Sequence, residues 1–206
     1  LFVKPQLPEA IVWEGKKCGV DEVGYFGANQ GYDISLLDKF VNAIPRDHYI
    51  FTNVSMYETD LLGGNLPANP RFIIPDGFGS DSIKQLKPIL SKQRAFKDDN
   101  EINLMKIAGD ISGEGHRQIM RFTPVLKNER DIETIFDFSC KISGGPLARQ
   151  GYVPVVASGD NALVLHYIHN NMLLTDEKLI MIDAGFEYNG YQSDITRTIP
   201  RSGKFT

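Results

Sequence analysis

The amino-acid sequence predicts a mixed α/β (α+β) protein built from two successive units, residues 1–92 and residues 93–206. In the first unit, short strand-like and helix-like segments alternate, as they do in small α/β domains. In the second unit, two long helical patterns precede a run of strand-like segments. A charged stretch marks the change between the two patterns, KQRAFKDDNEI. A chain of 206 residues is long enough to bury a substantial core.

The first unit contains one clear helical pattern. Apolar residues recur at helical spacing from Ile34 to Ile44, Asp33 precedes them as an N-cap, and Pro45 follows. The remaining segments read in order as a strand, a loop, a strand and a helix that Pro88 interrupts: HYIFTNV (48–54), GGNLPANP (63–70), RFIIP (71–75) and DSIKQLKPIL (81–90).

The second unit opens with two predicted helices. The first begins at Asp98 or Asp99 and ends before Pro124, with these apolar positions on one face: Ile102, Met105, Ala108, Ile111, Gly115, Ile119 and Phe122. The second runs from about Asn128 to the pair Gly144–Gly145, a usual helix stop. Four strand-like segments follow: YVPVVA, ALVLHY, KLIMIDAGF and YQSDITRTI.

The last two strand-like segments flank Asn189–Gly190, the strongest short signal for a two-residue hairpin turn. With that turn, Asp183 lies opposite Thr196, and Asp194 lies opposite Gly185. The two aspartates then share one face as diagonal neighbours, about 7–8 Å apart at Cα. A slip of one residue, or a bulge, would place them on different faces. The shared face therefore depends on the predicted turn.

The two faces of this hairpin differ in character. One is mostly apolar and is expected to pack on the core, whereas the other collects polar side chains: Asp183, Glu187, Gln192, Asp194, Thr196 and Thr198. Neighbouring carboxylates raise each other's pKa unless a cation lies between them. Two divalent ions about 3.5–4 Å apart would relieve the repulsion and generate a hydroxide nucleophile. An ordinary solvated face is the alternative. Gly185 favours the metal site, because its missing side chain leaves room for a ligand.

Composition excludes several other classes of protein. The formal net charge is -4 and no Lys/Arg stripe is present, so binding to nucleic acid is not expected. No apolar run approaches the roughly 18 residues of a membrane span. Two cysteines, Cys18 and Cys140, are too few for a disulfide framework or a zinc knuckle. The opening LFVKPQLPEA is not a signal or transit peptide, and a start at Leu indicates a processed or cut N-terminus.

Three ordered stretches carry a resemblance to a known family: RAFKDDNEINLMKIAGDIS, YVPVVASGDNALVLHY and MIDAGFEYNGYQSDITRTIP. They resemble the aminopeptidase P and prolidase family of pita-bread metallopeptidases, most of all the branch with mitochondrial Xaa-Pro aminopeptidase and the intermediate-cleaving peptidase. The resemblance spans essentially the whole chain. It implies part of an N-terminal creatinase-type α/β domain at 1–92 and the first half of a pita-bread catalytic domain at 93–206.

The resemblance also assigns site residues. Asp183 matches the family's first metal-binding aspartate, and Asp194 matches the second, which bridges both ions. His166 matches the active-site histidine that contacts substrate rather than metal. An alternating strand at 162–167 would place His166 on one side together with Val164, although a lone strand histidine is more often structural. The other histidines are interpreted as structural or loop residues: His48, His116 and His169.

The activity that the resemblance implies is removal of the N-terminal residue from peptides or imported precursors, classically before proline. Two divalent ions, usually manganese, would serve as the cofactor. The family's other ligands, a histidine and two glutamates, have no counterpart up to Thr206. The chain is therefore interpreted as an inactive internal segment of a longer enzyme. Peptide or protein N-termini are the expected partners, in a homo-oligomer placed in the mitochondrion, with the cytoplasm as the alternative.

Two other functions remain open at this point. A prolidase-like dipeptidase would cleave dipeptides rather than longer peptides. A non-catalytic pita-bread module that binds proteins is the alternative from another class. Such modules typically lose the metal-binding aspartates, whereas Asp183 and Asp194 are both present here.

Overall fold

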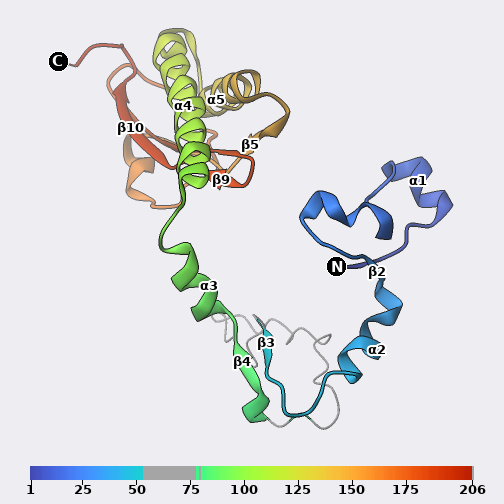
Figure 1. Cartoon of the computed structure of the whole chain (residues 1–206). Coiled ribbons are helices and arrows are strands. Elements are labelled where there is room, and N and C mark those ends of the chain that lie inside the picture. Colours follow the sequence, from blue (N-terminus) through green and yellow to red (C-terminus); the bar gives the residue numbers. More distant parts are fainter. Residues whose placement is uncertain (53–77, 79, 206) are drawn as a thin grey trace. The chain divides into compact units, whose positions relative to one another are not determined.

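The computed structural model describes residues 1–52, 78 and 80–205. The chain divides into two compact units, Leu1–Ala95 and Phe96–Thr206. Helices and strands occur in both units, which confirms the predicted α/β class (Figure 1). The domain boundary expected between residues 92 and 93 stays a prediction, because compactness alone does not define a domain. Across the described residues, no helix has the length and apolar character needed to cross a bilayer.

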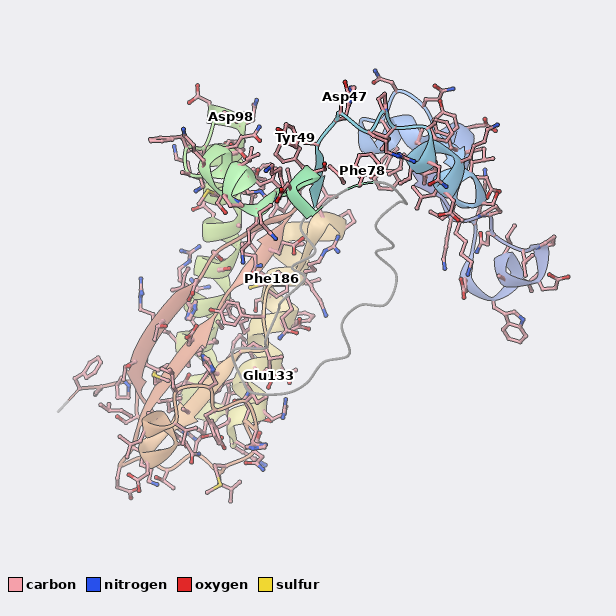
Figure 2. The ribbon with its side chains drawn as sticks, turned by 90° about the horizontal axis from the view of Figure 1, so that it is seen from below. Asp47, Tyr49, Phe78, Asp98, Glu133 and Phe186 are labelled. Atoms are coloured by element: carbon pink, nitrogen blue, oxygen red, sulfur yellow. The ribbon has the colours of Figure 1, made fainter. Side chains whose placement is uncertain are left out.

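The first unit consists of short elements that pair locally. Strand β1 pairs in parallel with β2, and β3 pairs in parallel with β4. In chain order the elements are β1 (Phe2–Val3), α1 (Pro8–Glu14), η1 (Val20–Phe26), β2 (Tyr32–Asp33), η2 (Ile34–Leu36), α2 (Leu37–Asn42), β3 (Ile50–Thr52), η3 (Ser80–Ser82), β4 (Ile83–Gln85) and α3 (Lys87–Arg94). Figure 2 labels Phe78, whose ring lies 4.6 Å from the guanidinium carbon of Arg46.

Of the elements predicted for the first unit, one helix is confirmed and another is wrong. Asp33 caps the predicted helix by accepting a hydrogen bond from the Ser35 amide at 2.8 Å, and the helix continues as α2. The helix expected at 81–90 is wrong, since β4 occupies its first half. Pro88 stands in the first turn of α3, where a missing N–H is tolerated, instead of interrupting a helix. The segments 63–70 and 71–75 lie outside the described residues.

Two long helices form the layer that supports the second unit. Helix α4 (Asp99–Phe122) begins with Asp98 as its N-cap, which exchanges hydrogen bonds with Glu101. Helix α5 (Glu129–Gly144) begins with Asn128 as its N-cap and ends at Gly145, which has a φ of 62°. Both predicted helices are confirmed. Their ends could be read from the sequence because caps and glycine stops act within a few residues.

The strands of the second unit form two small sheets, with orders β10-β7-β6 and β5-β8-β9. The bounds are β5 (Ala148–Gln150), β6 (Val155–Ser158), β7 (Leu179–Ala184), β8 (Phe186–Tyr188), β9 (Tyr191–Gln192) and β10 (Ile195–Pro200), with short 3-10 turns η4 (Thr123–Val125), η5 (Gly145–Leu147) and η6 (Gly159–Leu163). The strand expected at 162–167 is wrong, because η6 and a turn occupy it. Gly159, Asp160 and Asn161 are turn-forming residues that end β6.

The core of this unit lies between the helices and the sheets. Phe186 of β8 packs edge-on against Phe136 of α5, with ring centroids 5.9 Å apart, and its side chain lies between the helical and strand layers (Figure 2). The buried core residues come from both helices and four strands: Ile111, Ile119, Ile132, Phe136, Cys140, Val156, Ile180, Ile182, Ala184, Phe186 and Ile199. Alternate residues of β7 are buried, as expected for a sheet with one core face.

Helix α4 packs tightly against α5 at Gly115. A Cβ built on Gly115 would lie 2.6 Å from the Cys140 sulfur and 2.7 Å from Phe136 Cδ2. Real Cβ contacts are longer than this, and Cys140 and Phe136 are fully buried, so neither can move aside freely. The helix crossing therefore requires a glycine here.

We expect Gly115→Ala to lower the free energy of unfolding of the full-length protein by about 1–3 kcal/mol, since it overpacks a closed core. Gly109→Ala, on the same helix, is the matched control. A Cβ at Gly109 has no neighbour within 4 Å, so better helix propensity should raise stability by up to about 1 kcal/mol. Urea denaturation of both variants measures the difference. Equal effects in the two variants would contradict the close crossing.

Candidate metal centre

The hairpin that carries the two aspartates has the predicted register. Tyr188 pairs with Tyr191, and Asp183 pairs with Thr196 across β7 and β10. Asn189 has a φ of 46° and Gly190 a φ of 89°, which is the geometry of a two-residue turn with both central residues left-handed. The turn therefore sets which residues face each other along both strands.

The strand ladder is interrupted where Asp194 lies. Between β7 and β8 the chain passes through Gly185, and a Cβ there would come 1.9 Å from the Ser193 carbonyl oxygen and 2.9 Å from Tyr152 Cε1. The expectation that Gly185 leaves room for a ligand is thus wrong. Protein atoms take that space, and the missing side chain allows the two backbone segments to approach. Asp194 follows Ser193 directly and lies between β9 and β10.

The two aspartates meet at the hydroxyl of Tyr152. Its oxygen lies 2.6 Å from Asp183 Oδ1 and 3.1 Å from Asp194 Oδ1. Burial raises the pKa of the Tyr152 hydroxyl, and the hydrogen bond to Asp183 and the charges of both aspartates raise it further. The hydroxyl therefore stays protonated and shares its one hydrogen between the two carboxylates, with the shorter contact to Asp183. Sequence reasoning gave no role to Tyr152, although this residue opens the stretch YVPVVASGDNALVLHY, because its contact with Asp183 spans 31 residues and exists only in the folded chain.

Two polar residues of α4 hold the backbone beside each aspartate. The hydroxyls of Ser112 and Ser193 are 2.6 Å apart, and the Phe186 amide donates to Ser112 Oγ at 2.9 Å. One helical turn further, Nε2–H of His116 donates to the Ala184 carbonyl at 3.1 Å. Ser193 precedes Asp194, and Ala184 follows Asp183. Helix α4 thus positions the backbone of the hairpin on both of its strands.

His116 is buried, with 4% of its surface exposed. Burial lowers the pKa of its imidazole, which favours the neutral ring. A neutral ring that donates one N–H to a backbone carbonyl is a structural histidine, as the sequence analysis interpreted it. Its position behind the aspartates was not foreseen, because only tertiary packing brings α4 to the hairpin.

His166 has no direct hydrogen bond to the aspartate pair among the described residues. It follows η6 in a turn, and its side chain is exposed. Its role in binding substrate therefore stays a prediction. Of the other histidines, His169 lies in a loop and its carbonyl accepts from Arg130, while His48 lies 2.9 Å from Asp47 in the first unit.

The donor set at the hairpin suits a hard divalent cation. Two carboxylates converge on one point, and carboxylate oxygens are the ligands that magnesium, manganese and calcium prefer. Among the described residues, no group of three or more His, Cys, Asp or Glu side chains is arranged to hold a metal. Two carboxylates are fewer ligands than such ions take, so Asp183 and Asp194 by themselves do not make up a complete site.

Known proteins share this architecture. A probable Xaa-Pro aminopeptidase of Pyrenophora tritici-repentis is 35% identical, and the match covers all of this chain and 42% of that protein. Intermediate cleaving peptidase 55 of Saccharomyces cerevisiae is 33% identical, with 100% and 41% covered. A zinc-substituted aminopeptidase P of E. coli in complex with product matches 98% of this chain and 47% of that chain, with 26% identity and a TM-score of 0.80.

These matches confirm the resemblance found in the sequence. The architecture is that of the aminopeptidase P class of pita-bread proteins. The chain belongs to metallopeptidase family M24, whose sequence pattern matches residues 103–206. Membership in a metallopeptidase family implies divalent metal ions. The chain spans about 42% of the first relatives that it matches.

Removing the hydroxyl that joins the aspartates tests this geometry. We expect Tyr152→Phe to weaken divalent metal binding by the full-length protein about 10- to 100-fold, because groups that orient metal ligands contribute on this scale. Tyr191→Phe is the matched control, since the Tyr191 hydroxyl donates to Glu101 at 2.6 Å. Isothermal titration with Mn²⁺ measures both. Unchanged affinity in Tyr152→Phe would show that the hydroxyl does not orient the ligands.

Proposed function

We propose that the full-length protein is a metal-dependent aminopeptidase that removes the N-terminal residue from peptides, with proline as the preferred second residue. The observation that carries this proposal is the convergence of Asp183 and Asp194 on one hydroxyl in an M24 chain. Relatives named Xaa-Pro aminopeptidase and intermediate cleaving peptidase support the reaction class. Peptide and protein N-termini are the substrates under this proposal.

Under the same proposal, Asp183 and Asp194 hold part of a pair of divalent ions, with manganese as the metal. The relatives are more than twice as long as this chain, and their remaining length offers room for the other ligands. When bound, such a pair supplies Lewis acidity and lowers the pKa of water near the scissile carbonyl. Both carboxylates are available for this task, because each is only partly buried or exposed.

The chain's own residues divide the remaining work. Tyr152 keeps the two carboxylates oriented toward a common point, and its protonated hydroxyl offsets part of their repulsion. Helix α4 keeps the hairpin backbone in place through Ser112 and His116. His166, on an exposed turn, contacts the substrate near the bond that is cut. We also propose a homo-oligomer in the mitochondrion, from the branch that the sequence resembles, with the cytoplasm as the alternative.

Replacing one aspartate tests the ligand assignment. We expect Asp194→Ala to lower kcat/KM of the full-length protein on an Xaa-Pro peptide by more than about 100-fold, beyond the usual loss for an outer-shell partner. Chelation should abolish the activity of the unaltered protein, and Mn²⁺ should restore it. Asp176→Ala is the control, because the Asp176 side chain is 78% exposed and its ion-pair partner is Arg201, at 3.9 Å. Retained cleavage in Asp194→Ala would refute the assignment.

Substrate length separates the proposed activity from that of a prolidase-like dipeptidase. We expect the full-length protein to cleave an Xaa-Pro-Xaa tripeptide or longer peptide with a higher kcat/KM than an Xaa-Pro dipeptide. Product analysis by mass spectrometry measures both reactions under the same metal concentration. Cleavage confined to the dipeptide would favour the prolidase alternative, and cleavage of neither peptide would favour a binding module.

A further inference from the structure

The second unit contains a buried carboxylate that the proposed metal centre does not use. Glu129 is the first residue of α5, and its side chain has 0% of its surface exposed. An ionised carboxylate without partners would be very costly at such a position. Its hydrogen bonds therefore show what the surrounding structure is built to hold.

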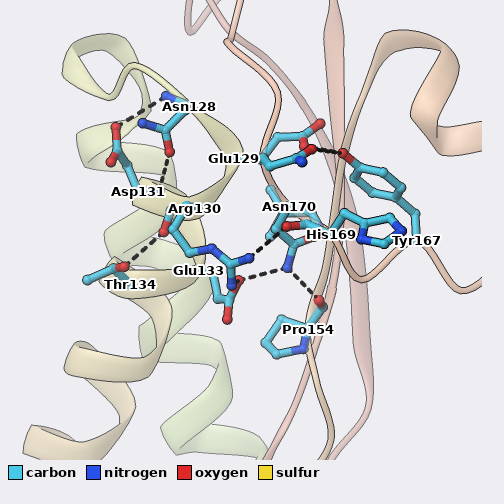
Figure 3. A network of polar contacts seen from close by, with 12 residues as sticks. Asn128, Glu129, Arg130, Asp131, Glu133, Thr134, Pro154, Tyr167, His169 and Asn170 are labelled. Atoms are coloured by element: carbon cyan, nitrogen blue, oxygen red, sulfur yellow. Dashed lines mark hydrogen bonds and ion pairs between the residues drawn. The ribbon is translucent and has the colours of Figure 1, made fainter.

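Five hydrogen bonds reach Glu129. Its Oε1 accepts from the Ser158 amide at 2.8 Å, the Ser158 hydroxyl at 2.8 Å and Asn161 Nδ2 at 3.0 Å. Its Oε2 accepts from the Tyr167 hydroxyl at 2.8 Å and the Met172 amide at 3.0 Å. Figure 3 shows Glu129 facing Tyr167 across the network. All the donors lie between residues 158 and 172, so one carboxylate gathers a single segment of chain.

These contacts leave the carboxylate oxygens no lone pair for a further ligand. A carboxylate offers about four lone-pair positions, and five donors already occupy its two oxygens. Burial raises the pKa of Glu129, but the amides of Ser158 and Met172 and the side chain of Asn161 outweigh burial and lower it. Glu129 is therefore a charged structural group, and it is poorly suited to bind a metal or transfer a proton.

The segment that Glu129 holds includes His166. Asn161 precedes this histidine, and Tyr167 follows it directly, so the carboxylate fixes the chain on both sides. Apolar packing does not hold the stretch between them, because Leu163 is 87% exposed and Leu165 is 82% exposed. Hydrogen bonds to α5, together with the packing of the buried Tyr167 ring in a cluster with Val155 and Ala157, therefore determine where the His166 backbone lies.

A second set of contacts from the same helix supports the far end of this segment. Asn170 is fully buried with a φ of 47°, and its Nδ2 donates to Glu133 Oε2 and to the Pro154 carbonyl, both at 2.8 Å. Arg130 donates to the His169 carbonyl at 2.7 Å. Figure 3 shows the bonds from Arg130 and Glu133 joining the first turns of α5 to the segment, and the bond from Asn170 to Pro154 beside them.

We propose that Glu129 is a positioning residue that holds His166 where it meets the substrate. This inference rests on the proposed function, in which His166 contacts the peptide. It assigns to the start of α5 a role in catalysis that is separate from metal binding, since the network touches neither Asp183 nor Asp194 within the described residues.

A double-mutant cycle in the full-length, metal-loaded protein tests the inference. The variants are Glu129→Gln, His166→Ala and the two combined. We expect Glu129→Gln to lower kcat/KM about 10- to 100-fold at unchanged metal content, because small displacements of a substrate-contacting group have effects of this size. In the His166→Ala background, the same change should cost no more than about twofold, since the group that it positions is already absent.

Asp137→Asn on α5 is the matched control. Asp137 forms an exposed ion pair with Lys141, so kcat/KM should stay unchanged. If Glu129→Gln fails to fold, Tyr167→Phe removes only the hydroxyl next to His166, which contacts Glu129 and Asn171, and it should show the same non-additivity.

The outcomes separate the inference from the function on which it rests. Equal losses from Glu129→Gln with and without His166 would overturn the positioning role and leave the proposed function intact. Loss of metal in Glu129→Gln would likewise overturn it, because the network would then support the metal centre. Unchanged kcat/KM in His166→Ala, with cleavage still dependent on Asp194, would overturn the substrate role of His166 and this inference together.

Discussion

The close approach of the backbone at Gly185 is the constraint on which the candidate site depends. The Ser193 carbonyl occupies the space where any other residue at position 185 would carry its Cβ. The hairpin can therefore pass from one small sheet to the other without losing register. Asp194 lies at this transition and reaches the same hydroxyl as Asp183.

Helices α4 and α5 connect the hairpin to the rest of the unit. Residues 112–116 of α4 contact the hairpin through Ser112 and His116, while Gly115 on the same stretch meets the core side of α5. The first turn of α5 then binds the segment around His166 through Glu129. A continuous set of packed and hydrogen-bonded groups thus links the metal-binding candidates to the substrate-binding candidate.

The unit treats its carboxylates in two opposite ways. Glu129 is buried and fully hydrogen-bonded, so its charge stabilises the contact between α5 and residues 158–172. Asp183 and Asp194 are more accessible and share one tyrosine hydroxyl, which leaves oxygen lone pairs for a ligand. Like charges this close favour a cation between them. The number of hydrogen-bond donors that already occupy the carboxylate oxygens, more than the residue type, distinguishes a structural acid from a candidate metal ligand.

Local signals in the sequence determined the two helices of the second unit and the register of the hairpin. The caps Asp98 and Asn128 and the turn Asn189–Gly190 act within a few residues, so a pattern along the chain reveals them. Tertiary structure alone decided the places of Tyr152 and of Glu129, whose partners lie as far as 42 and 43 residues away. At 162–167 the turn-forming residues Gly159, Asp160 and Asn161 act together with the hydrogen bonds to Glu129, and they give η6 and a turn where a weak alternation of apolar residues predicts a strand.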